Sequence, residues 1–194
     1  MNANSGQEAF NTPNKNYNDL MTIDDVFTPN ECDHIISLGY ENISSSGETR
    51  GGKSGIRDCF VGAFPFDAET KYIYNRILKV AKNVNNRFLG FDIRGIYNAQ
   101  YIEYSHEGAK YDWHTDHGPG QNSLRKLSIV IQLSEPDDYQ GGDLEVWYGP
   151  QPKSATRKRG SAIIFPSFVL HRVTPVDRGI RRSLVTWVLG PPWR

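Results

Sequence analysis

Residues 160–189 read "GSAIIFPSFVLHRVTPVDRGIRRSLVTWVL", and this stretch decides the fold class. It contains three short runs rich in Val, Ile, Leu, Phe and Trp, separated by Pro, Gly and Asp. Such runs between turn residues are typical of β-strands. Because side chains alternate across a strand, one face of the last run carries Arg181, Ser183, Val185 and Trp187.

Similar runs fill the chain from residue 92 onward, with no helix-length pattern between them. Many short strands at this spacing predict an all-β sandwich, barrel or jelly roll. Two earlier stretches carry helical signals. Thr28, Pro29 and Glu31 form a helix start signal, and an apolar stripe between Asp67 and Phe88 predicts a second helix. We therefore expect a mainly β fold with N-terminal helices.

The remaining segments are predicted to be a tail, loops and turns. Residues 1–18 are rich in Asn and small polar residues, so we expect a flexible N-terminal tail before a single domain at 19–194. The Gly/Ser-rich stretch 43–58 is expected to be a long loop that serves as a lid or binding loop. The basic run 156–159 is expected to be a solvated turn.

Charge and composition exclude several classes of protein. The 22 basic side chains balance 22 acidic ones, so no broad field favours nucleic acid or an anionic membrane. Two cysteines, Cys32 and Cys59, are too few for a disulfide framework. Neither a membrane-spanning apolar run nor an N-terminal signal segment is seen. We expect a cytoplasmic protein that binds neither nucleic acid nor membrane; its oligomeric state stays open.

Residues 111–120, "YDWHTDHGPG", concentrate polar chemistry in one short segment. A metal site, an acid–base pair and a polar turn all explain it. Residues two apart in a strand share a face, so His114 and Asp116 offer two metal ligands. A catalytic metal needs a third, and the remaining histidines are His34, His106, His117 and His171. We favour His171, because it begins a strand in the β-rich half.

Arg181 indicates what the site binds. If Trp187 points into the barrel, Arg181 does too, and a buried arginine needs an anionic partner. Apart from the candidate ligand Asp116, these strands carry no obvious spare carboxylate. A small dicarboxylate ligand would supply the charge, because a guanidinium binds a carboxylate in a bidentate manner.

The order H-x-D, a distal His and a basic residue ten positions further resembles that of the iron(II)- and 2-oxoglutarate-dependent dioxygenases. The resemblance is strongest to their prolyl 4-hydroxylase-like branch and extends from about Phe27 to Trp187. It covers "FTPNECDHII", "YIEYSHEGAKYDWHTD", "SIVIQLSEPDDYQGGDLEV" and "GSAIIFPSFVLHRVTPVDRGIRR". It implies a double-stranded β-helix, or jelly roll, buttressed by helices.

The resemblance also implies site residues and cofactors. The implied Fe(II) ligands are His114, Asp116 and His171. The implied contacts to the co-substrate 2-oxoglutarate come from Arg181, Tyr104 and Gln132. The implied substrate contacts come from Tyr111, Arg125 and Trp187. O2 would be the oxidant, ascorbate is a candidate reductant, and residues 43–58 and 117–123 would be flaps over the substrate.

The implied reaction is hydroxylation of an unactivated C–H bond, with decarboxylation of 2-oxoglutarate to succinate. Related halogenases lack the carboxylate ligand, whereas Asp116 is present here. The leading substrate hypothesis is a prolyl residue in a peptide or protein. The alternatives are a free amino acid or other small metabolite as substrate, a non-catalytic jelly-roll binding module, and a zinc hydrolase, which would give Arg181 no role.

Overall fold

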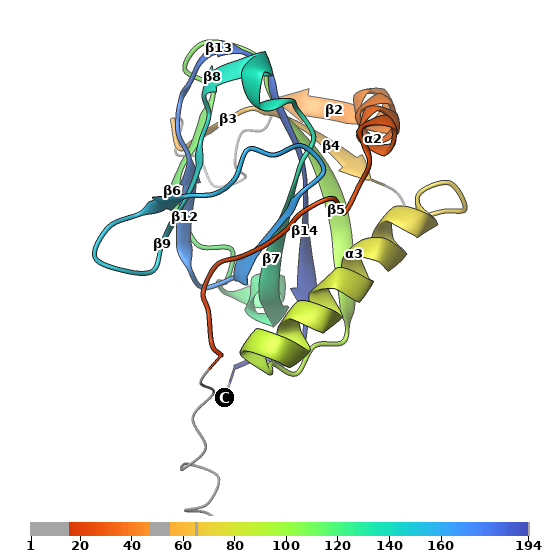
Figure 1. The fold of residues 1–194 in the computed structure, drawn as a ribbon, viewed down its shortest axis with the longest axis vertical. Coiled ribbons are helices and arrows are strands. Elements are labelled where there is room, and N and C mark those ends of the chain that lie inside the picture. The colour runs from red at the N-terminus through yellow and green to blue at the C-terminus, as the bar shows by residue number, and fades with distance from the viewer. Residues whose placement is uncertain (1–15, 47–54, 65, 194) are drawn as a thin grey trace, which may run out of the picture.

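The computed structural model describes residues 16–46, 55–64 and 66–193, and within these ranges two antiparallel sheets face each other (Figure 1). The larger sheet runs in the order β1 (Met21–Ile23), β11 (Ala162–Pro166), β7 (Arg125–Gln132), β14 (Arg181–Leu189), β5 (Gly95–Tyr104), β4 (Phe60–Phe64) and β2 (Ile43–Ser46). The smaller sheet runs in the order β10 (Lys153–Ser154), β9 (Leu144–Trp147), β12 (Leu170–Val173), β6 (Lys110–His114) and β3 (Arg57–Asp58). A separate pair joins β13 (Val176–Gly179) to β8 (Tyr139–Gly141). The predicted jelly roll is confirmed.

The first predicted helix is confirmed as α2 (Pro29–Glu41). Its start has the local chemistry that the sequence indicates. The Glu31 backbone N–H donates to the Thr28 hydroxyl oxygen at 3.3 Å, and the Glu31 carboxylate accepts from the Thr28 backbone N–H at 2.9 Å. This reciprocal capping box satisfies two backbone donors that a helix start leaves unpaired.

The second predicted helix exists, but its predicted bounds are wrong at the start. Helix α3 covers Lys71–Val84, and a π-helical turn, η1 (Asn85–Leu89), extends it. The Asp67 carboxylate accepts from the Glu69 and Thr70 backbone N–H groups at 2.9 and 3.0 Å. Asp67 thus stabilises a local turn before the helix, a common role of aspartate. Two short 3₁₀ helices, η2 (Gly120–Leu124) and η3 (Pro136–Asp138), complete the elements.

The predicted loop at 43–58 is wrong at both ends. Ile43–Ser46 forms β2 and Arg57–Asp58 forms β3, each at one edge of its sheet. Residues 47–54 lie outside the described residues, as do residues 1–15 of the predicted tail. Edge strands bury little side-chain surface, so they lack the apolar alternation that reveals central strands.

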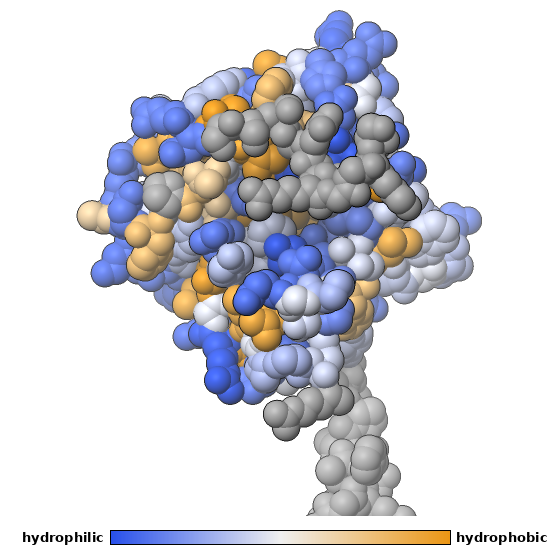
Figure 2. All heavy atoms as spheres, turned by 180° about the vertical axis from the view of Figure 1, so that it is seen from behind, coloured by the Kyte–Doolittle hydropathy of each residue, from blue (hydrophilic) through white to orange (hydrophobic). Residues whose placement is uncertain are grey.

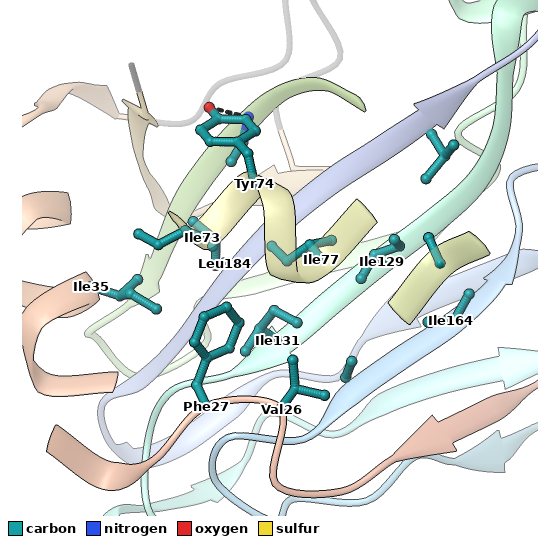
Figure 3. Packing of buried hydrophobic residues seen from close by; sticks show 14 of the residues in the cluster. Val26, Phe27, Ile35, Ile73, Tyr74, Ile77, Ile129, Ile131, Ile164 and Leu184 are labelled. Atoms are coloured by element: carbon teal, nitrogen blue, oxygen red, sulfur yellow. Dashed lines mark hydrogen bonds between the residues drawn. The ribbon is translucent and has the colours of Figure 1, made fainter. Parts of the chain in front are cut away.

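Two hydrophobic clusters lie on the two faces of the larger sheet. One lies between this sheet and the helices, where Ile77 of α3 packs near Ile129 and Leu184 (Figure 3). The other lies between the two sheets, and Val185 packs against it. Leu184 and Val185 therefore point to opposite sides of β14, which confirms the predicted alternation of that strand.

The basic run at 156–159, which its composition predicts to be a solvated turn, is partly exposed to solvent and also paired with acidic side chains. Its three cations each pair with carboxylates: Arg157 with Asp143, Lys158 with Asp25, and Arg159 with Asp33 and Glu135. These pairs neutralise the run and connect it to segments far away in sequence.

The face shown in Figure 2 interleaves hydrophilic and hydrophobic residues. In the described part of the chain, none of the helices is long and apolar enough to cross a membrane.

On the helix side of β14, Arg182 is paired and largely buried. Its Nε donates to the Glu103 carboxylate at 3.0 Å, and its Nη2 donates to the Tyr40 hydroxyl at 2.7 Å. Glu103 is 6% exposed. Arg182→Ala should lower the free energy of unfolding by about 3 kcal/mol, because a buried carboxylate loses its cation. Urea denaturation of this variant and of Arg182→Ala/Glu103→Gln measures the effect; the double variant should regain part of the loss, and equal stabilities would contradict the explanation.

Candidate active site

A His–Asp–His cluster forms where β6 and β12 pair. His114 ends β6 and lies directly opposite His171 of β12, and Asp116 follows two residues after His114. One ligand atom from each of the three lies within 4.8 Å of the others. His114 Nε2 is 3.8 Å from Asp116 Oδ1, and His171 Nε2 is 3.5 Å from Asp116 Oδ2. The structure thus brings together the three residues that the sequence predicts as metal ligands.

The other histidines that were candidates for the third ligand have different surroundings. His34 stacks on Tyr72 on the helix side, with ring centroids 6.3 Å apart. His106 Nε2 lies 2.9 Å from the Asp58 carboxylate at the surface. The His117 backbone N–H donates to the Ser167 carbonyl at 2.9 Å, and its ring takes no part in the cluster. The choice of His171 as the third residue of the cluster therefore agrees with the structure.

Hydrogen bonds orient both imidazoles toward the centre of the cluster. His114 Nδ1 lies 2.7 Å from the Asp112 carbonyl oxygen, and His171 Nδ1 lies 2.9 Å from the Val169 carbonyl oxygen. A carbonyl can only accept, so each Nδ1 carries the proton and each Nε2 presents a lone pair. This is the orientation that backbone partners impose on metal-ligating histidines.

Burial and neighbouring charges set the protonation of the cluster. Burial, followed by repulsion from His171, holds the pKa of His114 below its ordinary value, so the ring is neutral near pH 7. Burial alone would raise the pKa of Asp116, but the two histidines and a 2.6 Å hydrogen bond from the Ser128 hydroxyl outweigh it, and the pKa is lowered. Two imidazoles and one carboxylate are the donor set of non-haem Fe(II) sites. The residues present therefore fit iron.

A cavity of about 160 Å³ opens beside the cluster, between the two sheets. Apart from the ligands, five of the predicted site residues line it: Tyr104, Tyr111, Arg125, Arg181 and Trp187. Ser183 and Val185 line it as well, so the whole predicted inner face of β14 borders the cavity. Gln132 is buried but is not among the lining residues.

Arg181 is 1% exposed and its described partners are neutral. Its Nη2 donates to the Gln132 carbonyl oxygen at 3.2 Å, and its Nη1 donates to the Ser183 hydroxyl at 3.3 Å. Among the described residues, Nε has no hydrogen-bond partner and no carboxylate pairs with the guanidinium. The Gln132 amide also donates to the Thr156 carbonyl at 2.8 Å. Gln132 thus lies behind Arg181 and positions it; its own contact with 2-oxoglutarate stays a prediction.

The three predicted substrate residues form the wall nearest the cluster. Tyr111 stacks on His114 with ring centroids 3.5 Å apart. The Arg125 guanidinium lies 3.8 Å from the centroid of the Trp187 ring, a cation–π contact. Arg125 Nη1 also donates to the Asp116 backbone carbonyl at 3.3 Å. This wall is aromatic and cationic. Tyr111 contacts His114, Arg125 contacts Asp116, and Trp187 contacts Arg125.

Sequence reasoning missed Arg57, which lines the same cavity. Strand β3 pairs with β6 so that Arg57 lies opposite Tyr111, and its guanidinium is 4.9 Å from the centroid of that ring. Its Nε donates to the Cys59 sulfur at 3.2 Å. The local signal was weak, because only the two-residue spacing of Arg57 and Cys59 indicates a strand in this Gly/Ser-rich stretch.

Comparisons with known proteins agree with this geometry. The chain is 29% identical over 168 residues to a PKHD-type hydroxylase of Azoarcus sp. (strain BH72), covering 84% of this chain and 74% of that protein. It is 42% identical over 91 residues to a PKHD-type hydroxylase of Hyphomonas neptunium (strain ATCC 15444), covering 45% of this chain and 41% of that one. The match to that second relative therefore spans about two fifths of its length.

Solved structures share the fold at low sequence identity. A prolyl-4-hydroxylase of Pseudomonas putida superimposes with a TM-score of 0.70 at 20% identity, over 89% of this chain and 93% of that one. A prolyl hydroxylase of Trichoplax adhaerens, solved with a peptide fragment of hypoxia inducible factor, superimposes with a TM-score of 0.75 at 18% identity, over 91% of this chain and 85% of that one.

The sequence profile described as "2OG-Fe(II) oxygenase superfamily" matches residues 99–189. These residues include the whole His–Asp–His cluster and Arg181. With the shared jelly roll and the similarity to PKHD-type hydroxylases, this match shows that residues 99–189 are similar to the 2OG-Fe(II) oxygenase superfamily.

Proposed function

We propose that the chain hydroxylates a prolyl residue in a peptide or protein, with decarboxylation of 2-oxoglutarate to succinate. The observation that carries the reaction class is Arg181, a buried cation with neutral partners in the same cavity as the His–Asp–His cluster. A zinc hydrolase gives this arginine no role. A dicarboxylate co-substrate does, because one end would bind at the metal cluster while the distal carboxylate would pair with the guanidinium.

The cluster could hold Fe(II), the metal that this superfamily uses with 2-oxoglutarate and O2. His114, Asp116 and His171 would be its ligands, and three protein ligands leave coordination positions open. When bound, Fe(II) with 2-oxoglutarate supplies the oxidising chemistry, which belongs to the cofactor rather than to a side chain. For this reason no residue of the chain is assigned as a general base.

The chain's own residues bind, orient and exclude water. Arg181 would hold the distal carboxylate of 2-oxoglutarate, with Gln132 fixing the guanidinium and Tyr104 beside it at 5.3 Å from ring centroid to Cζ. Ile102, Val130, Leu144 and Val173 give the same cavity apolar walls. These walls keep the reacting atoms away from bulk water and strengthen each charge interaction inside.

The prolyl substrate is supported by relatives rather than by a contact in this structure. The curated relatives are named PKHD-type hydroxylases, and two structural neighbours are named prolyl hydroxylases, one of them solved with a peptide. In this chain Tyr111, Arg125 and Trp187 would contact the peptide, because they form the wall beside the cluster.

Mass spectrometry tests the proposal. The protein is incubated with Fe(II), 2-oxoglutarate and O2 together with pools of prolyl peptides or of free amino acids, with and without ascorbate. We expect prolyl peptides to gain one oxygen atom and succinate to form in equal amount. Oxygen transfer to free amino acids alone would replace the peptide substrate with a small molecule. Absence of 2-oxoglutarate binding would contradict the reaction class itself.

A further inference from the structure

Three arginines line the cavity, and only one is explained by the co-substrate. They are Arg57, Arg125 and Arg181, whereas Asp116 is the single carboxylate among the described lining residues. Apart from the histidines, these side chains carry three positive charges and one negative charge, an excess of two. Fe(II) adds two positive charges and the 2-oxoglutarate dianion removes two, so the excess of two remains. This excess lies at Arg57 and Arg125, since 2-oxoglutarate pairs with Arg181 and the metal with Asp116.

Arg57 is held in the wall by neutral groups. Its hydrogen bond to the Cys59 sulfur uses Nε alone, and its guanidinium lies over the Tyr111 ring. Among the described residues, its two terminal NH₂ groups have no hydrogen-bond partner and no carboxylate pairs with it. The adjacent Asp58 is engaged elsewhere, with its carboxylate 2.9 Å from His106 Nε2. The described residues therefore leave this guanidinium available to an external anion.

The backbone fixes Arg57 close to the metal cluster. Arg57 lies opposite Tyr111 in the pairing of β3 with β6, and the neighbouring Asp112 backbone N–H donates to the Ile56 carbonyl at 2.7 Å. Tyr111 contacts both Arg57 and the ligand His114. A group bound at Arg57 would therefore be separated from the ligand His114 only by the Tyr111 ring.

We propose that Arg57 binds a carboxylate of the substrate, so that the enzyme selects acidic substrates. The inference rests on the proposed function and adds a specificity-determining residue to it. Arg125, stacked on Trp187, supplies the second positive charge in the same cavity. The carboxylate has two sources: an Asp or Glu side chain next to the hydroxylated residue of a peptide, or the α-carboxylate of a free amino acid.

Matched pools of prolyl peptides test the selection. The pools are identical except that Glu and Asp of the first become Gln and Asn in the second and Lys in the third. Binding to the enzyme loaded with Fe(II) and 2-oxoglutarate is measured without O2, and oxygen insertion is measured after O2 is added. We expect the wild type to prefer the acidic pool. Arg57→Gln should weaken binding of that pool about 10- to 100-fold, the range for a lost hydrogen bond to a charged group.

Three controls make the result specific. Arg57→Gln should leave binding of the amide pool and the Michaelis constant for 2-oxoglutarate unchanged, which also shows that the cavity is folded. Arg57→Glu should shift preference toward the lysine pool. Arg178→Gln, at an exposed position of β13, should behave like the wild type. A separate experiment compares the binding of free amino acids with that of their amides. If the enzyme prefers the free acid to the amide but shows no preference among the peptide pools, the carboxylate belongs to a small substrate.

Two outcomes would overturn the inference. One is equal binding of the acidic and amide pools by the wild type, together with no preference between free acids and their amides. The other is an Arg57→Gln variant whose defect is confined to 2-oxoglutarate, which would make Arg57 a co-substrate residue. If oxygen is inserted equally into the acidic and amide pools, the proposed selection of acidic substrates is refuted and the proposed hydroxylase activity stands. If the enzyme binds the acidic pool selectively but inserts no oxygen, the proposed selection stands and the proposed hydroxylase activity is refuted.

Discussion

Replacing His114 or His171 by alanine should reduce succinate formation more than 100-fold and weaken iron binding. Each histidine supplies one Nε2 to a cluster whose ligand atoms lie within 4.8 Å of one another. Loss of a residue that merely supports a metal ligand costs roughly 10- to 100-fold, so loss of the ligand itself should cost more. Succinate release with saturating 2-oxoglutarate and an anaerobic Fe(II) titration measure the two effects separately.

His34→Ala is the matched control for these variants. His34 lies on α2 and stacks on Tyr72, on the helix side of the larger sheet. Its replacement should leave both iron binding and succinate formation near wild type. Because His171 is buried, thermal unfolding of each variant must be compared first. A folded His114→Ala or His171→Ala protein with wild-type turnover would show that the cluster is not the iron site.

The sequence predicts those parts of the site that local periodicity places. The two-residue spacing of His114 and Asp116 puts both on one side of a strand, and the structure finds them in one cluster. The same counting along β14 assigns Arg181 to the cavity and Leu184 to the helix side, as observed. These inferences hold because a strand has a strict period of two, and a shift by one residue would expose the whole apolar set.

The features that escaped prediction depend on partners distant in sequence. Arg57 reaches the cavity only because β3 pairs with β6, and nothing near residue 57 indicates that pairing. The basic run at 156–159 looks solvated in sequence, yet Arg159 pairs with Asp33, more than a hundred positions earlier. Single-sequence reasoning measures local preference, so charges whose partners come from other elements are assigned to solvent by default.

The ion pair of Arg182 and Glu103 shows why the side of β14 that an arginine faces decides whether it can bind the co-substrate. Consecutive arginines on β14 point to opposite sides of the larger sheet, and each meets different chemistry. Arg182 finds a protein carboxylate within 3.0 Å. Arg181 finds only the neutral Gln132 and Ser183. The chain therefore satisfies one buried cation by itself and leaves the other for a ligand.

Arg181→Ala should raise the Michaelis constant for 2-oxoglutarate steeply and leave iron binding nearly intact. Losing a desolvated, charge-assisted contact costs about 2–5 kcal/mol, which corresponds to roughly 30- to several thousand-fold in affinity. Iron binding should persist because Arg181 is not part of the His–Asp–His cluster. Isothermal titration with 2-oxoglutarate in the presence of Fe(II), without O2, measures the affinity directly.

Two further variants test two separate points. The first asks whether the bidentate geometry of the guanidinium or only its charge matters. The second asks whether the co-substrate lies on the Arg181 side or the Arg182 side of β14. Arg181→Lys should be milder than alanine, because lysine keeps the charge and loses bidentate geometry. Arg182→Ala/Glu103→Gln removes the pair on the other side of β14 without leaving a buried charge unpaired, and it should change affinity for 2-oxoglutarate only a few-fold. If the double variant lost 2-oxoglutarate binding while Arg181→Ala kept it, the co-substrate would lie on the helix side, and the cavity between the sheets would need another ligand.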